Sequence, residues 1–188
     1  NNDICDSSTD KKGPEHDGLS EFGGKVVKEM NELGMLIDVS HISDKSFYDV
    51  LELSKVPVIA SHSSVRSFAH HNRNLSDEMI KALAKNGGVI QICLLDDYIK
   101  DPDTTTVYYQ KRKELNLIYD TQYDSMTDEQ KKKLRNEWRT LKENYPKTLP
   151  TVCDCVDHID YVKNLVGIDY VGIGSDFDGG GGVDGCAD

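Results

Sequence analysis

The fold class of this chain is decided by the stretch GMLIDVSH, residues 34–41. This stretch joins a short apolar run to a turn that ends in histidine, and the stretch PVIASHSS, residues 57–64, has the same form. Apolar runs of four or five residues are typical of buried parallel strands, which are covered on both faces. We therefore expect strands at residues 35–39 and 57–60, each followed at its carboxyl end by a histidine.

Helical segments alternate with these runs and with two more of the same kind. Residues 89–93 and 170–174 predict a third and a fourth strand. A hydroxyl that can cap a helix stands before each intervening segment of helical apolar periodicity. These caps are Ser20, Ser43, Ser76 and Thr151. Parallel strands need crossover connections, so the alternation predicts an α/β fold, which is either an open doubly wound sheet or a barrel.

Three side chains of the kind that bind metals follow predicted strands. His41 and His62 are 21 residues apart, and Asp176 comes just after the fourth strand. Neighbouring parallel strands lie ~4.8 Å apart, so both imidazoles project from one rim, close enough to share an ion. Parallel barrels build their active sites at this carboxyl-terminal rim, which favours a barrel. Two histidines and a carboxylate there indicate a metal-assisted hydrolase.

Simpler interpretations exist for each candidate residue. A lone histidine at a strand end is more often a polar loop residue, and Asp176 is also suited to cap a helix. Arg73, just before a predicted helix on the same rim, is either a surface charge or a bidentate clamp for a substrate carboxylate. Ser63 and Ser64 lack the G-x-S-x-G elbow of serine hydrolases. We interpret the remaining histidines as structural or surface residues: His16, His70, His71 and His158.

Composition and charge narrow the classes of partner. The 188 residues include 33 acidic and 22 basic side chains, a formal net charge of −11. A nucleic-acid-binding face needs clustered Lys and Arg, so we expect no nucleic acid and no anionic membrane surface as partner. No run approaches the ~20 apolar residues of a spanning helix, so we expect no membrane segment. The five cysteines match no disulfide framework or zinc knuckle, and the compartment stays open.

Residues 101–149 interrupt the alternation of strands and helices. The segment is densely charged, and Thr127 with Gln130 has the form of a capping box. This pattern predicts a polar helix that runs to about residue 144. We interpret residues 101–149 as a helical, charged insertion on the outside of the domain and assign it no function.

Several motifs resemble the renal (membrane) dipeptidase family in sequence, order and spacing. They are GLSEFG at residues 18–23, GMLIDVSHIS at 34–43, PVIASHSS at 57–64, NRNLSD at 72–77, VDHIDY at 156–161 and VGIGSDFDG at 171–179. The resemblance covers roughly residues 16–100 and 150–182. It implies a (β/α)8 barrel of the TIM type that holds two zinc ions and cleaves dipeptides, often with a D-residue at the C-terminal position.

The resemblance also implies a role for each candidate residue. His41 and His62 match two histidines that bind one of the zinc ions. Arg73 matches the arginine that holds the substrate carboxylate, and Tyr98 falls where the family has an active-site tyrosine. Asp176 matches the aspartate beside the metal-bridging water, where it shuttles a proton. The implied partner is a dipeptide substrate, and a homodimer is one candidate for the oligomeric state.

Two departures indicate that the chain is the C-terminal part of such a barrel. The family's H-x-D motif, its bridging glutamate and a further histidine have no counterpart here. Four predicted strands in 188 residues also fall short of the eight strands and ~250 residues of a closed barrel. We therefore expect about the C-terminal half of a single barrel domain, in a chain that opens on Asn1 rather than Met. By itself it is expected to be a poor catalyst.

Two alternatives to the dipeptidase hypothesis stay open. One is another barrel metallohydrolase of the amidohydrolase type, which acts on a cyclic amide, an ester or an amine and gives Arg73 no carboxylate to hold. The other is a catalytically incomplete barrel fragment with a binding role. The metal is open as well, because two histidines and a carboxylate also accept manganese, cobalt or iron.

Overall fold

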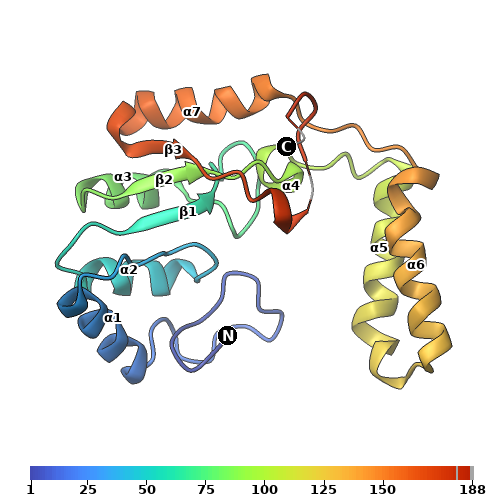
Figure 1. The fold of residues 1–188 in the computed structure, drawn as a ribbon, viewed down its shortest axis with the longest axis horizontal. Coiled ribbons are helices and arrows are strands. Elements are labelled where there is room, and N and C mark those ends of the chain that lie inside the picture. The colour runs from blue at the N-terminus through green and yellow to red at the C-terminus, as the bar shows by residue number, and fades with distance from the viewer. Residues whose placement is uncertain (181, 187–188) are drawn as a thin grey trace. The chain divides into compact units, whose positions relative to one another are not determined.

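Two compact units make up the chain in this computed structural model, which describes residues 1–180 and 182–186 (Figure 1). The sheet unit comprises Asn1–Asp101 and Pro150–Asp188, and the hairpin unit comprises Pro102–Leu149. The hairpin unit therefore leaves and re-enters the sheet unit between two elements of the latter.

The sheet unit is built on three parallel strands in the order β1-β2-β3. They are β1 (Ile59–Ser63), β2 (Val89–Ile92) and β3 (Val171–Ile173). Ile59 pairs with Val89, and Ile90 pairs with Val171. Each strand is joined to the next through helical segments, as parallel pairing requires, so the predicted parallel α/β organisation is confirmed for these strands.

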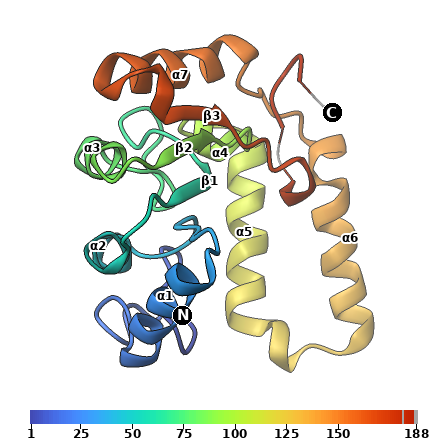
Figure 2. The ribbon, with the colours of Figure 1, turned by 60° about the vertical axis from the view of Figure 1, so that its left-hand side comes forward.

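Helices flank this sheet along its outer side. They are α1 (Glu21–Leu33), α2 (Asp44–Leu53), α3 (Asp77–Lys85), the short α4 (Asp96–Ile99) and α7 (Val152–Val166), with one-turn 3-10 helices η2 (Ile168–Tyr170) and η3 (Phe177–Gly179). Figure 2 shows α2, α3 and α7 on the same side of the strands. Successive helices pack on one another, α1 on α2, α2 on α3 and α3 on α7.

The predicted helix starts are confirmed. The side chains of Ser20, Ser43, Ser76 and Thr151 each accept a hydrogen bond from a backbone N–H in the first turn of α1, α2, α3 and α7. Gly34 ends α1 with a φ of 69°, a left-handed conformation that glycine adopts without steric cost. The apolar core lies between the helices and the sheet. Its fully buried side chains include Phe47, Ile80, Leu83, Ile90 and Ile92.

The predicted strand at residues 35–39 is only a single bridge in the structure. Asp38 pairs with Ile59, and the Val39 N–H donates to the Ile59 carbonyl at 2.8 Å. Met35 and Leu36 are 51% and 63% exposed. The segment has β1 on one side, and among the described residues no strand pairs with its other side, so the ladder is too short to count as a strand.

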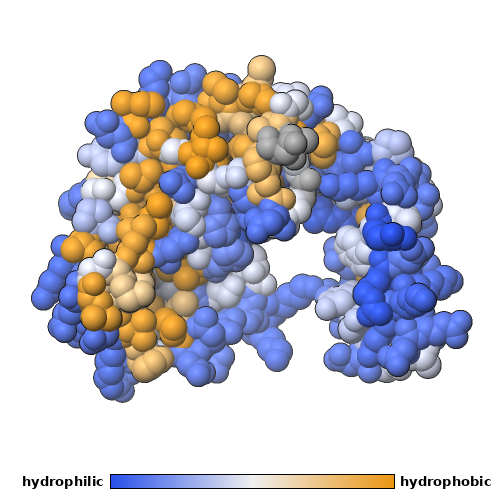
Figure 3. All heavy atoms as spheres, viewed as in Figure 1, coloured by the Kyte–Doolittle hydropathy of each residue, from blue (hydrophilic) through white to orange (hydrophobic). Residues whose placement is uncertain are grey.

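Some apolar side chains of α1 and α7 lie outside the core. Phe22 and Leu33 in α1, and Val152 and Val156 in α7, are exposed. Periodicity identifies the apolar stripe of a helix but not how much of it a neighbour covers. Figure 3 shows apolar side chains gathered over part of the sheet unit.

The hairpin unit contains two antiparallel helices with a core of their own (Figure 2). They are α5 (Val107–Gln122) and α6 (Asp128–Asn144), joined through the 3-10 helix η1 (Tyr123–Ser125). The predicted capping box of Thr127 and Gln130 opens α6, whereas α5 was not anticipated. The buried residues of this core are Tyr108, Leu115, Leu134 and Leu141. Of the helices described, none is long and apolar enough to cross a membrane.

Candidate functional site

Two imidazoles meet at the carboxyl end of β1. His62 lies in β1, and His41 lies in the loop that follows the bridged segment 35–39. Their Nε2 atoms are 2.9 Å apart, with ring centroids separated by 4.9 Å. His41 has a φ of 75°, which a residue with a side chain rarely adopts. The structure thus brings together the two histidines that the sequence singled out.

A hydrogen-bonded chain stands behind His62. The Asp38 Oδ1 accepts the backbone N–H groups of Ser40 and Ser61 at 2.9 and 3.1 Å. The Asp38 Oδ2 accepts the Ser61 hydroxyl at 2.5 Å, and the Ser61 Oγ lies 2.7 Å from the His62 Nδ1. The Ser40 hydroxyl in turn accepts the His62 backbone N–H at 3.1 Å. Asp38 and Ser61 were not predicted as site residues, although both belong to the stretches that precede the two histidines.

Arg73 is buried beside this pair, at 3% exposure. Its Nη2 donates to the His62 carbonyl oxygen at 3.1 Å, and its guanidinium carbon lies 5.5 Å from the centre of the Tyr98 ring. Its Nε is buried without a hydrogen-bond acceptor, and no described carboxylate forms an ion pair with it. A buried cation without a counter-ion is costly, so this guanidinium is suited to receive an anion from solution.

Tyr98, in the short helix that follows β2, lies next to Arg73. It lies in α4, is half-buried, and packs its ring at 4.6 Å from that of His71. The Arg73 backbone N–H donates to the His71 Nδ1 at 3.1 Å. Burial raises the pKa of Tyr98, against the opposing effect of Arg73, so its hydroxyl stays protonated at neutral pH and can donate a hydrogen bond.

Asp176 lies in the loop that leaves β3, directly before the 3-10 helix η3. Its backbone is left-handed, with a φ of 57°, and its carbonyl accepts the Gly179 N–H at 3.0 Å. A Cβ on Gly179 would come within 2.5 Å of the Asp176 carboxylate. Any other residue at position 179 would therefore clash with this carboxylate. The thiol of Cys93, just past β2, lies 3.8 Å from the Asp176 Oδ2. Burial raises the pKa of Cys93 to about 11, so it is a neutral thiol.

Electrostatics at this rim favour the neutral form of His41. Partial burial lowers its pKa, and the positive charge of Arg73 and the neighbouring His62 lower it further, against Asp176 and Asp38. A neutral imidazole is the form that binds a metal. Burial by itself would raise the pKa of Asp38, but hydrogen bonds from Ser61 and Ser40 outweigh it and the net pKa is lowered. Asp38 is therefore a carboxylate.

The two histidines fit one side of a metal centre. Among the described residues no group of three or more His, Cys, Asp or Glu side chains converges as a complete metal site would. Tetrahedral zinc with bonds of about 2.0–2.1 Å sets two ligand nitrogens roughly 3.3 Å apart. The observed Nε2–Nε2 distance is 2.9 Å, so the two rings would have to move apart only slightly to bind one zinc ion. His41 and His62 therefore match two ligands of a single ion.

Of the structural and surface interpretations of His158, the structure supports the structural one, because the residue lies in the core. It is 1% exposed, its Nδ1 accepts the Val65 N–H at 3.1 Å, and its Nε2 lies 2.8 Å from the Ile99 carbonyl. Because Val65 N–H is a donor and the carbonyl an acceptor, the ring is neutral with its proton on Nε2. Burial lowers its pKa. The residue links α7 to the loop after β1 and to the last residue of α4.

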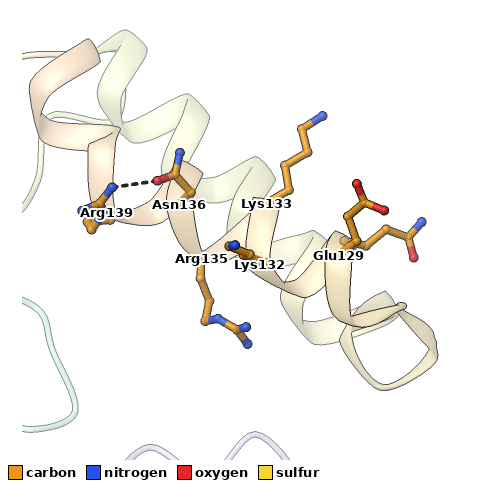
Figure 4. A pocket seen from close by; sticks show the side chains of 7 residues that line it. Glu129, Lys132, Lys133, Arg135, Asn136 and Arg139 are labelled. Atoms are coloured by element: carbon orange, nitrogen blue, oxygen red, sulfur yellow. Dashed lines mark hydrogen bonds between the residues drawn. The ribbon is translucent and has the colours of Figure 1, made fainter.

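A hollow of about 780 Å³ lies on the surface of α6 (Figure 4). It is lined by Glu129, Gln130, Lys132, Lys133, Arg135, Asn136 and Arg139. All of these residues come from one helix, and none of them belongs to the histidine rim. All seven side chains are exposed. The hollow is therefore the space between long side chains on the surface of one helix.

Comparison with known proteins agrees with the geometry. The family model described as membrane dipeptidase, peptidase family M19, matches residues 1–188. The dipeptidase verJ of Clonostachys rogersoniana is 35% identical over 178 residues, which are 95% of this chain and 34% of that protein. The chain therefore spans about a third of the length of this curated relative.

Solved structures give the same assignment. The "probable dipeptidase PvdM" from Pseudomonas aeruginosa superposes with a TM-score of 0.82 at 34% identity, over 100% of this chain and 51% of that one. A metallopeptidase from Rhodobacter sphaeroides, bound to a phosphinate mimic of the dipeptide L-Ala-D-Ala, gives 0.62 at 26% identity over 92% and 37%. With the fold, the histidine rim and the whole-length family match in agreement, the chain belongs to the membrane dipeptidase family.

Proposed function

We propose that the full-length protein hydrolyses the amide bond of dipeptides in a metal-dependent reaction, with C-terminal D-residues among its substrates. The family match and the dipeptidase names of its relatives support hydrolysis of dipeptides. The phosphinate dipeptide mimic bound to the R. sphaeroides relative supports acceptance of a D-residue. The observation that carries the proposal for this chain is the buried Arg73, which has an unpartnered Nε beside the histidine pair.

His41 and His62 would hold the metal, which we take to be one of two zinc ions. Their Nε2 atoms face each other 2.9 Å apart, and the lowered pKa of His41 favours the neutral form of that imidazole. The remaining ligands would come from the part of the full-length protein that lies outside this chain. Bound zinc activates water and polarises a carbonyl group.

Arg73 would anchor the free carboxylate at the C-terminus of the substrate. The guanidinium is buried and lacks an ion-pair partner among the described residues, so a carboxylate would satisfy it by charge-assisted hydrogen bonds. Its hydrogen bond to the His62 carbonyl at 3.1 Å fixes it next to the metal ligand. Tyr98, which contacts the guanidinium through its ring, would hold the same end of the substrate.

Asp176 would carry the proton. The carboxylate accepts a proton from the water that adds to the amide carbon, and then delivers it to the departing nitrogen as the C–N bond breaks. The products are two amino acids, and no other reactant is consumed. Asp176 stands at the end of β3, on the same rim as His62 at the end of β1.

The complete domain would be a (β/α)8 barrel. The three parallel strands described here, with helices on their outer side, would form a contiguous part of its wall. The exposed Met35 and Leu36 on one side and Ile173 on the other lie where further strands would pack. The hairpin unit, Pro102–Leu149, would be an insertion outside the barrel.

Substrate profiling of the full-length protein tests the role of the carboxylate. We expect cleavage of a dipeptide and little cleavage of its C-terminal amide. Arg73→Ala should lower kcat/KM for the dipeptide by about 10- to 100-fold, the range for a charged hydrogen bond, and abolish the preference over the amide. Arg66→Ala is the matched control, because the Arg66 guanidinium already binds Asp44 at 2.7 Å, and it should leave the preference intact.

Two results would contradict this proposal. If the amide were cleaved as well as the dipeptide, the site would need no carboxylate and another amidohydrolase activity would replace the dipeptidase. If a folded, metal-loaded protein cleaved neither compound, a binding role would be favoured.

A further inference from the structure

The protons in the chain Asp38–Ser61–His62 have only one consistent arrangement. Asp38 is a carboxylate, which accepts hydrogen bonds and cannot donate one. Its Oδ2 lies 2.5 Å from the Ser61 Oγ, so the single hydroxyl proton of Ser61 must point to Asp38. The Ser61 Oγ, 2.7 Å from the His62 Nδ1, can then only accept, and the His62 Nδ1 must carry a proton.

The proton on Nδ1 determines the state of the other ring nitrogen, Nε2, which faces His41. A neutral imidazole with its proton on Nδ1 has its lone pair on Nε2, and the Nε2 of His62 is the atom that faces His41 at 2.9 Å. We propose that Asp38 and Ser61 are positioning residues that select the metal-binding tautomer of His62 and fix its ring orientation. This inference rests on the proposed assignment of His62 as a metal ligand.

The carboxylate is itself held in one orientation. Both backbone donors, the N–H groups of Ser40 and Ser61, bind the same oxygen, Oδ1. Oδ2 is thereby left for the Ser61 hydroxyl. Asp38 is bound to Ser40 in its own turn and to Ser61 in the middle of β1, so the Asp38–Ser61–His62 relay is formed without a bound ligand.

This geometry gives Asp38→Asn a specific effect. The amide oxygen should take the place of Oδ1, because the two N–H groups require an acceptor there, and the NH2 group should then face the Ser61 Oγ. An NH2 group donates, so the Ser61 hydroxyl proton would turn to the His62 Nδ1. The proton of the imidazole would then move to Nε2, the atom that should bind the metal.

The first experiment reads the tautomer of His62 in the full-length protein after the metal has been removed. Histidine labelled with 15N gives distinct NMR signals for protonated and unprotonated ring nitrogens, and loss of a signal set in His62→Gln assigns it. We expect the proton on Nδ1 in the unaltered protein and on Nε2 in Asp38→Asn. The same tautomer in both proteins, or a proton on Nε2 in the unaltered one, would overturn the proposal.

The second experiment measures zinc affinity by competition with a chelator. Ser61→Ala should weaken binding by about 10- to 100-fold, the range for loss of a partner behind a metal-binding histidine. Ser61→Thr keeps the hydroxyl and should restore most of the affinity. Ser64→Ala is the matched control, since its hydroxyl donates to the Cys93 carbonyl at 3.1 Å and does not contact His62. Equal affinities in Ser61→Ala and Ser64→Ala would contradict the positioning role.

The two proposals fail in different ways. A protein that binds zinc through His62 but cleaves no dipeptide would refute the proposed function and leave the relay standing. A protein that cleaves dipeptides normally with Ser61→Ala and an unchanged zinc affinity would refute the relay and leave the dipeptidase standing.

Discussion

Two of the candidate site residues have a left-handed backbone. Of the described residues other than glycine, only Asp17, His41 and Asp176 have a positive φ, a conformation that costs of order 1 kcal/mol or more and tends to cluster at functional sites. The surrounding structure holds His41 in place, because the Ser8 N–H donates to its carbonyl at 2.8 Å. The polar segment at the start of the chain thus supports the conformation of His41, the proposed metal ligand.

Asp176→Asn is the most informative single change at the residue scale. Asparagine keeps the shape of the side chain and tolerates a left-handed backbone, but it cannot accept the proton. We expect kcat for dipeptide hydrolysis in the full-length protein to fall by about 10²- to 10⁴-fold, the usual range for a general acid–base group, with the zinc content unchanged.

The matched control for this change is Asp178→Asn, an exposed carboxylate two residues along. Steady-state kinetics should show near-parental activity for the control. A loss of less than about threefold in Asp176→Asn would remove the residue from the proposed chemistry.

Helix boundaries in this protein are set by local interactions and therefore follow from the sequence. A Ser or Thr hydroxyl and the backbone N–H groups of the next turn are enough to start α1, α2, α3 and α7. Strand boundaries depend on neighbours far along the chain. The apolar run at residues 35–39 does not become a full strand for this reason, while β1 extends through His62 to Ser63.

His158 connects three elements and gives the stability of the sheet unit a pH dependence. Its folded-state pKa is lowered by burial from the ordinary value of about 6.5. Its contribution to stability is thus fully present above that value and decreases as the pH falls from about 6.5 toward the lowered pKa. The slope is at most about 1.4 kcal/mol per pH unit, because only the unfolded state takes up the proton.

Denaturant unfolding of the full-length protein at pH 7.5 and 5.5 measures this effect. His158→Asn can keep an acceptor for the Val65 N–H but leaves the Ile99 carbonyl without its donor, so it should cost about 1–3 kcal/mol. It should also flatten the pH dependence. His70→Asn, at an exposed residue paired with Asp101, should cost less than about 1 kcal/mol. An equally steep pH dependence in His158→Asn would show that another group is responsible.

At the scale of the whole molecule, the sheet unit and the hairpin unit have separate cores. The buried residues of the hairpin, such as Leu134, form a cluster of their own, and Ile90 belongs to the cluster of the sheet unit. Stability in proteins is distributed in cooperative units that often coincide with such clusters. The two units are therefore expected to open independently.

Hydrogen exchange in the full-length protein tests this independence. Leu134→Ala removes packing worth about 2–5 kcal/mol and should speed amide exchange in α5 and α6 while β2 keeps its protection. Ile90→Ala should have the converse effect. Leu117→Ala, at a residue that is 62% exposed in the same hairpin, should change neither. Faster exchange in β2 with Leu134→Ala would mean that the two units unfold together.

The site itself was only partly predictable from the sequence. His41, His62 and Asp176 could be identified because strand ends in a parallel sheet converge on one rim. The burial of Arg73 and the proton order of the Asp38–Ser61–His62 chain could not, because both depend on side-chain contacts made between different segments. Periodicity and spacing place a residue on a rim but do not define its hydrogen bonds.

The most direct test of the dipeptidase assignment is kcat/KM of the full-length protein for L-Ala-L-Ala and L-Ala-D-Ala. The measurement should be made before chelation, after chelation and after zinc is restored. We predict cleavage that is lost on chelation, regained with zinc, and absent in His62→Ala under all three conditions. Cleavage that survives complete removal of the metal would contradict the account, as would a folded, zinc-loaded protein that cleaves neither dipeptide.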